Sequence, residues 1–223
     1  KSDNTATDHI LFLAGRENVE QAMTAMGVSE PGRNIPLFST RELTMLKFAS
    51  PTDRIDAYFA SDAEQRRRIL TDEIARIPYE ALADLDQTAP IEIDRVEWFA
   101  TREDLARTMA WLHQASQRPG LRPVTEILSL ETPIPFDGEI WPYVGYKGGS
   151  EMGVLSGTWL LQRADGRHFV YSGGFRDPDA ALDMPAAVAA MEAGVWPPTP
   201  HLEAGVLESG PLRVVTASEP WSA

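Results

Sequence analysis

The chain has 223 residues, 43% of them hydrophobic, a formal net charge of −13 and no cysteine. This length and apolar content suffice for one large domain or two small ones with a proper core. The acidic balance argues against a nucleic-acid partner, because lysine and arginine drive binding to phosphates. The lack of cysteine excludes disulfides, thiolate metal sites and a cysteine nucleophile. No stretch approaches the roughly 18 apolar residues that indicate a transmembrane helix, so we expect no membrane span in this chain.

The first part of the chain has the apolar spacing of helices. Residues 5–14 form one amphipathic run, which Asp3 or Asn4 can cap. Residues 17–26 form a second run that ends at Gly27, a residue suited to a helix C-terminus. Further helical spacing is present at residues 40–49, 53–85 and 101–112.

The apolar spacing changes to a period of two residues beyond Pro133, which indicates strands. A hairpin turn is predicted at Ala164-Asp165-Gly166, where glycine tolerates a positive φ. The expected elements are strands at residues 143–150, 153–163 and 168–174, an alanine-rich helix at 184–195 and a strand at 212–216 within a proline-rich tail.

These patterns together predict an α/β (α+β) fold with two domains. A helical domain is expected at residues 1–130, with an insert at about residues 50–97. An antiparallel sheet domain, flanked by a C-terminal helix and a tail, is expected at residues 131–223. Within the insert, Ile91 and Ile93 alternate in a loop-like stretch and predict a short strand.

Two motifs carry the functional argument: Ser2-Asp3-Asn4 and Lys147-Gly148-Gly149-Ser150. Each motif alone is typical of a common structural feature, a helix cap for the first and a strand end for the second. Together they are informative, because one opens a helix in a helical half and the other lies on the first of three predicted strands. No serine in the chain is followed three residues later by lysine, so the S-x-x-K arrangement of a nucleophilic serine is missing.

In this order the motifs resemble the S-D-N and K-T-G signatures of the penicillin-recognising serine hydrolases, with Gly148 in place of threonine. Residues 1–27, 98–112 and 143–178 are similar to bacterial serine hydrolases grouped beside class A β-lactamases, including related lipoproteins and the β-lactamase-like proteins of clavulanic acid gene clusters. The resemblance implies a β-lactamase/transpeptidase-like fold without its N-terminal strands. Residues 169–172 would then form an unpaired strand edge.

The resemblance also implies roles for individual residues. Ser2 would relay a proton and Lys147 would be its partner, while Asn4 would bind the amide of the substrate. Gly149 would let the strand approach the substrate, and Ser150 would supply a backbone N–H to the oxyanion hole. The expected activity is acyl transfer from a β-lactam or small ester to a serine upstream of this chain, so residues 1–223 alone are expected to be inactive.

Departures from the family pattern leave an alternative open. The glutamate that clears the acyl-enzyme in class A β-lactamases has no counterpart, and Glu42 is either a replacement base or a surface or salt-bridging residue. Gly148 lacks the threonine hydroxyl that binds the β-lactam carboxylate. The alternative is a binding protein that keeps the fold and has lost turnover.

No metal or cofactor is expected. The four histidines lie on different predicted elements without an i, i+4 pair, which argues against a metal site or a histidine-based mechanism. They are His9, His113, His168 and His201.

Overall fold

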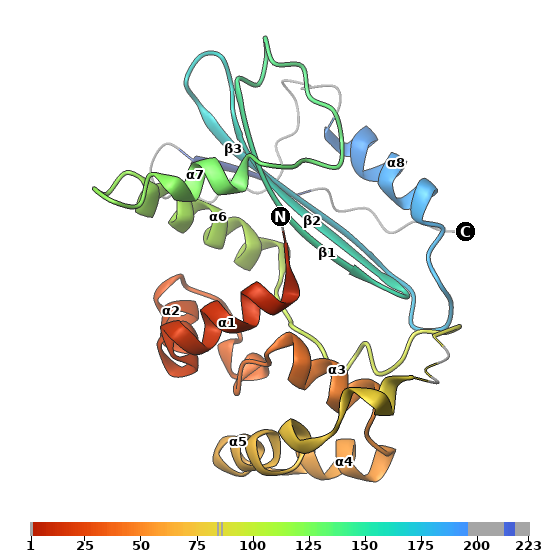
Figure 1. Ribbon diagram of the computed structural model, residues 1–223. Coiled ribbons are helices and arrows are strands. Elements are labelled where there is room, and N and C mark those ends of the chain that lie inside the picture. Colours follow the sequence, from red (N-terminus) through yellow and green to blue (C-terminus); the bar gives the residue numbers. More distant parts are fainter. Residues whose placement is uncertain (1, 84, 86, 196–211, 217–223) are drawn as a thin grey trace. The chain divides into compact units, whose positions relative to one another are not determined.

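The computed structural model describes residues 2–83, 85, 87–195 and 212–216, and it confirms the α+β class (Figure 1). The chain divides into two compact units. The helical unit comprises residues 2–99 with 178–180, and the sheet unit comprises residues 100–177 with the described residues after 180. Within the described ranges, no helix combines the length and apolar character needed to cross a bilayer.

The helical unit begins with two short helices joined at Gly15, whose φ of 83° suits glycine. Side chains cap several of its helices, as the sequence predicts for the first one. Ser39 caps α3 in a reciprocal capping box with Glu42. The elements are α1 (Asn4–Ala14), α2 (Arg16–Ala25), η1 (Pro31–Asn34), α3 (Thr40–Phe48), α4 (Thr52–Ala60), α5 (Ala63–Asp72), η2 (Ile74–Arg76) and η3 (Tyr79–Leu82).

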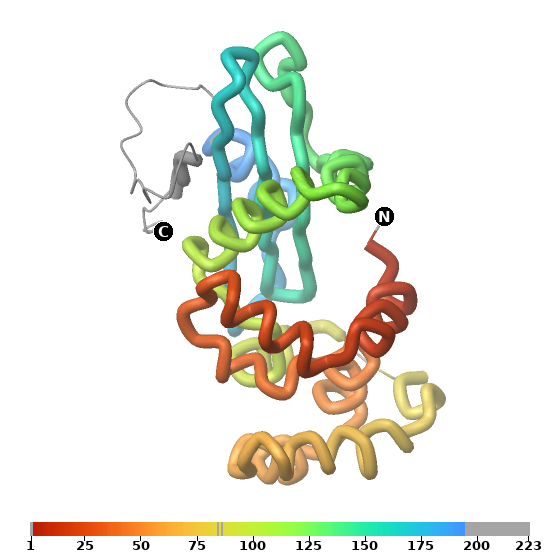
Figure 2. Tube along the Cα trace, turned by 90° about the vertical axis from the view of Figure 1, so that its left-hand side faces the viewer, coloured from red at the N-terminus to blue at the C-terminus, as the bar shows by residue number. Residues whose placement is uncertain are grey.

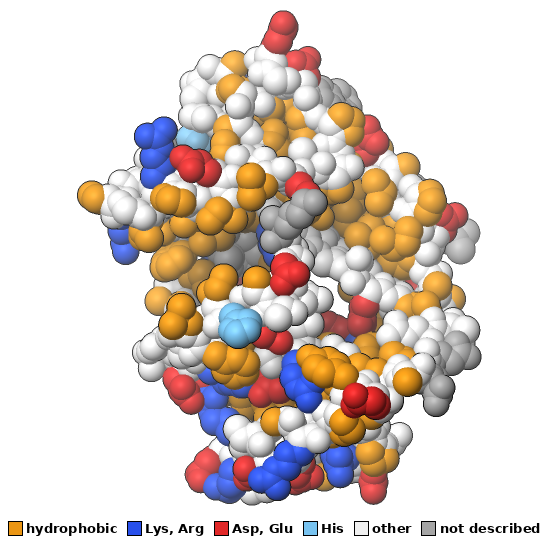
Figure 3. Space-filling model, in the orientation of Figure 1, with side chains coloured by type: hydrophobic (Ala, Val, Ile, Leu, Met, Phe, Trp, Pro, Cys, Tyr) orange, Lys and Arg blue, Asp and Glu red, His pale blue; other side chains and the backbone are white. Residues whose placement is uncertain are grey.

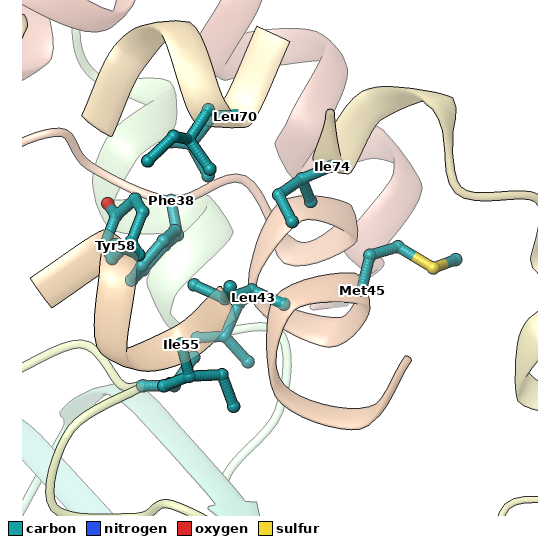
Figure 4. Close-up of a cluster of buried hydrophobic side chains, with 10 residues drawn as sticks. Phe38, Leu43, Met45, Ile55, Tyr58, Leu70 and Ile74 are labelled. Atoms are coloured by element: carbon teal, nitrogen blue, oxygen red, sulfur yellow. The ribbon is translucent and has the colours of Figure 1, made fainter. Parts of the chain in front are cut away.

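The core of the helical unit collects apolar side chains from α3, α4, α5 and η2 (Figure 4). Tyr58 lies between Phe38 and Phe59, with ring centroids 5.5 and 5.1 Å away. Each large side chain buried here stabilises the unit by about 1.5–3 kcal/mol relative to an exposed one. The members labelled in Figure 4 are Phe38, Leu43, Met45, Ile55, Tyr58, Leu70 and Ile74.

The short strand predicted at Ile91 and Ile93 is wrong. The segment forms a turn instead, in which the Val96 N–H donates to the Glu92 carbonyl at 2.8 Å. Ile93 and Val96 are buried in this turn. The alternation of Ile91 and Ile93 in the sequence therefore comes from apolar side chains that pack inward from a turn. A two-residue period alone does not distinguish such a turn from a strand.

The sheet unit has a sheet of order β1-β2-β3-β4, in which β4 is parallel to β3 and the other pairs are antiparallel. Helices α6 and α7 pack on one face and α8 on the other, with α6 in front of the strands and α8 behind them in Figure 2. The elements are α6 (Arg102–Ser116), α7 (Pro123–Leu128), β1 (Tyr143–Glu151), β2 (Val154–Gln162), β3 (His168–Arg176), α8 (Met184–Val195) and β4 (Leu212–Thr216).

Two details of this unit differ from the sequence expectations. The unpaired edge expected at residues 169–172 is wrong, because β4 pairs with β3 over this stretch. Among the described strands, the edges of the sheet are β1 and β4. The predicted boundary lies near residue 130, but the units divide between Phe99 and Ala100. Helix α6 belongs to the sheet unit because it packs against β2 and β3.

A row of glycines and a row of aromatic rings run side by side across the sheet on the α8 face. Gly148, Gly157 and Gly173 are register partners on β1, β2 and β3. Neighbouring rings of the aromatic row are tilted by 39° to each other, with centroids 5.0 and 5.4 Å apart. Each ring lies over the glycine of its own strand, as in the aromatic cover that stabilises glycines in sheets. The aromatic row consists of Tyr146, Trp159 and Tyr171.

The row explains the glycine at position 148. A Cβ atom on Gly148 would lie 2.6 Å from Cζ of Tyr146 and 2.8 Å from the Ser156 carbonyl oxygen. Both distances are far below van der Waals contact, so any side chain here must displace the tyrosine ring. The departure from the threonine of the K-T-G signature therefore has a steric cause in this chain.

We expect Gly157→Ala to lower the free energy of unfolding of the sheet unit by about 1–3 kcal/mol, the usual cost of overpacking. The new Cβ would lie 2.5 Å from Cη2 of Trp159, a ring that is itself fully buried. Urea denaturation followed by near-UV circular dichroism measures the effect. Gly138→Ala is the matched control, since no atom lies within 4 Å of its added Cβ. Equal midpoints for the two variants would contradict the packing described here.

Candidate functional site

The Ser2-Asp3-Asn4 motif forms the start of α1. The Asp3 carboxylate accepts a hydrogen bond from the Ala6 N–H at 2.7 Å, so Asp3 is the N-cap. Its carbonyl also accepts from the N–H and the hydroxyl of Thr7, at 2.9 and 2.8 Å. Ser2 and Asn4 are exposed on either side of this cap. The loop is therefore held by Asp3, and the side chains to which the family resemblance assigns substrate roles face solvent.

The Lys147-Gly148-Gly149-Ser150 motif lies on β1, an edge strand of the sheet. Lys147, Gly149 and Ser150 are exposed, and no atom lies within 4 Å of a Cβ added to Gly149. The Lys147 ammonium donates to the Gly148 carbonyl. Although Lys147 is exposed, the neighbouring protein desolvates its ammonium in part, and this lowers the pKa of the side chain. An open edge beside a lysine of lowered pKa suits an extended ligand and proton transfer.

The predicted site residues thus form two groups, one in each unit. Ser2 and Asn4 lie together at the start of α1, in the helical unit. Lys147, Gly149 and Ser150 lie together on β1, in the sheet unit. The pairing of Ser2 with Lys147 stays a prediction from the sequence.

Glu42 is fully engaged within the helical unit. One carboxylate oxygen accepts from the Arg16 guanidinium at 2.7 Å, and the other accepts from the N–H and the hydroxyl of Ser39, both at 2.8 Å. The carboxylate is buried, not on the surface, and it is salt-bridged. Two charge-assisted bonds to the capping box and one to arginine fix it as a structural group. This arrangement leaves little capacity for a general base.

A buried pair of hydroxyls, which the sequence did not predict, lies on the two strands next to Lys147. Thr158 and Ser172 are both buried, and their hydroxyl oxygens lie 3.0 Å apart. Lys147, Thr158 and Ser172 are register partners across β1, β2 and β3, so they share the face that carries α6. Strand register, which the sequence does not give, was the missing signal.

The fold also brings together two histidines that the sequence separates. The rings of His113 on α6 and His168 on β3 have centroids 4.1 Å apart. They lie at the end of the sheet where β1 and β3 begin, away from Gly149 and Ser150. Among the described residues, no group of three or more histidine or acidic side chains could hold a metal ion.

No protein-family model matches the chain, and no curated protein matches it in sequence. The family resemblance therefore depends on the two motifs and the order of elements around them.

Proposed function

We propose that this chain is part of a serine hydrolase of the β-lactamase and penicillin-binding type. The reaction would proceed through an acyl-enzyme on an amide or ester, with a β-lactam or a small ester as substrate. The attacking serine would come from outside residues 1–223, because no S-x-x-K sequence occurs among them. Lys147 and Ser2 would pass the proton to the leaving group, while Asn4, Gly149 and Ser150 would bind the substrate.

The observation that carries the proposal is the setting of Lys147. The lysine lies on an edge strand near Gly149 and Ser150, which are exposed and leave that edge accessible to a ligand. A lowered pKa increases the fraction of lysine able to accept a proton near neutral pH. The positive charge of its protonated form also attracts the carboxylate common to β-lactams and to peptide termini.

A second candidate is a binding protein with the same fold that holds a β-lactam-like or peptide ligand without turnover. The engagement of Glu42 favours it, because both carboxylate oxygens already have structural partners. The absence of a hydroxyl at Gly148 predicts weak recognition of a β-lactam carboxylate by either candidate, so it does not separate them.

The whole gene product that contains these residues is expected to form a covalent serine adduct with a fluorescent fluorophosphonate or penicillin. Residues 1–223 alone are expected to remain unlabelled, since they lack the nucleophile. Gel fluorescence and mass spectrometry of the adduct measure both results. Reversible penicillin binding without an adduct would favour the binding protein. Labelling of the isolated residues 1–223 would contradict the account of the nucleophile.

A further inference from the structure

A polar cavity of about 420 Å³ lies within the sheet unit, between the ends of α6 and α7 and the strand ends that meet there. Its size is that of a small-molecule site. Figure 3 shows a histidine, a basic and an acidic side chain gathered on the surface over α7. The side chains that define its chemistry are His113, Gln117, Arg122, Glu126, Gln162 and His168.

The two imidazoles form the central feature of the cavity. Their planes are tilted by 39°, and both rings are half-buried. Burial lowers the pKa of His113, and burial together with the charge of His113 lowers the pKa of His168. Near neutral pH both rings are therefore uncharged, and each offers one N–H donor.

The other charged and titratable groups around the rings come from α7 and β1. Arg122 and Glu126 lie 3.8 Å apart in a solvent-exposed pair, which contributes little energy and leaves the guanidinium available. The Tyr143 hydroxyl donates to the Thr125 carbonyl at 3.1 Å, and burial raises the pKa of this phenol, so it stays neutral. The formal charges of Arg122 and Glu126 cancel, so the cavity becomes positive only when the imidazoles take up protons.

We propose that this cavity binds a small oxyanion, phosphate or carboxylate, held by His113, His168 and Arg122, with uptake of a proton. An anion in the cavity, beside the edges of the two rings, would supply the opposite charge that a half-buried imidazolium lacks, which favours the protonated form. The carboxamide of Gln162 adds a neutral donor to the same cavity, whereas the amide of Gln117 already donates to the His113 carbonyl and the Ser116 hydroxyl. The site is separate from the exposed lysine edge and does not depend on the proposed hydrolase activity.

The sign of the pH dependence follows from linkage. Without ligand, the lowered pKa values keep the rings neutral into mild acid. With an anion bound, the pKa of the coupled rings rises, so binding takes up protons and its affinity increases as the pH falls. We expect affinity for acetate, which stays mostly ionised over this range, to be at least about tenfold higher near pH 5.5 than near pH 7.5, the range in which imidazole titrates.

The test uses residues 1–223, inorganic phosphate as the probe and acetate as a second arm. Imidazole proton resonances, assigned with single His→Gln variants, are followed against pH with and without each anion. Phosphate or acetate should raise the midpoints for His113 and His168, while the resonances of exposed His9 in the other unit should not respond when either anion is added. A preference for phosphate would identify phosphate esters as the ligand class, and a preference for acetate would identify carboxylates.

Arg122→Gln provides a second test that does not require the histidine variants to fold. The Arg122 side chain is 87% exposed, so its replacement should not disturb the fold. It should weaken phosphate binding in calorimetry by roughly five- to tenfold, the value of one hydrogen bond whose charge is screened by solvent at this exposed position. Arg118→Gln, an exposed arginine outside the cavity, is the matched control and should not change binding. Unchanged histidine midpoints with both anions, or equal affinities for the two arginine variants, would overturn the proposal.

Discussion

Replacing Lys147 by alanine should slow serine labelling of the whole gene product by about 100-fold or more, the contribution typical of a positioned proton-transfer group. The side chain is exposed on an edge strand, so its loss should leave the fold intact. Stopped-flow or gel-based labelling with a fluorescent penicillin measures the rate, and near-UV circular dichroism measures the fold.

Lys147→Arg separates charge from proton transfer. Arginine keeps the positive charge but does not lose a proton in proteins, so it should restore ligand attraction and not the proton step. We therefore expect the apparent affinity for penicillin to recover while the labelling rate stays low. An alanine variant that labels as fast as the unchanged protein would remove Lys147 from the mechanism.

The largest stability effect is expected in the other unit, at Lys47. Its side chain is fully buried at the end of α3 and pairs with Glu97, which is 16% exposed. Lys47→Ala leaves this carboxylate without its cation, which costs about 3–5 kcal/mol for a buried pair. Urea denaturation followed by far-UV circular dichroism, which reports the helices of this unit, measures the loss.

Two further variants make the stability prediction specific. Arg68→Ala breaks an exposed i, i+4 pair with Glu64 and should cost less than about 0.5 kcal/mol. The double variant Lys47→Met with Glu97→Leu removes both charges and should recover most of the loss, because neither charge is then buried alone. If Lys47→Ala were as mild as Arg68→Ala, the pair would not support the unit.

Local patterns in the sequence were sufficient for most of the elements. Asp3 caps α1 as expected, and glycines at positions 27 and 166 adopt the positive φ that helix ends and hairpin turns require. The bounds of the three antiparallel strands lie within two residues of those predicted. These features depend on residues that are near one another in the chain, so the sequence contains the information directly.

Long-range pairing was the part that the sequence could not supply. The contact between His113 and His168 and the hydroxyl pair of Thr158 and Ser172 depend on strand register and on where α6 packs. Whether β3 is an edge strand depends on whether the tail strand pairs with it. Periodicity gives the face on which a residue lies within its element, but not the neighbour that it meets across the fold.

The packing at Gly148 restricts which substitutions can be accepted during evolution. Because the Tyr146 ring occupies the space over position 148, the two positions constrain each other. A hydroxyl-bearing side chain at 148 needs a small residue directly before the lysine and also a shift of the Ser156 carbonyl, which lies 2.8 Å from the added Cβ. Relatives of this chain that carry threonine there should therefore have lost the tyrosine, and an engineer who wishes to reinstate the hydroxyl has to exchange both residues at once.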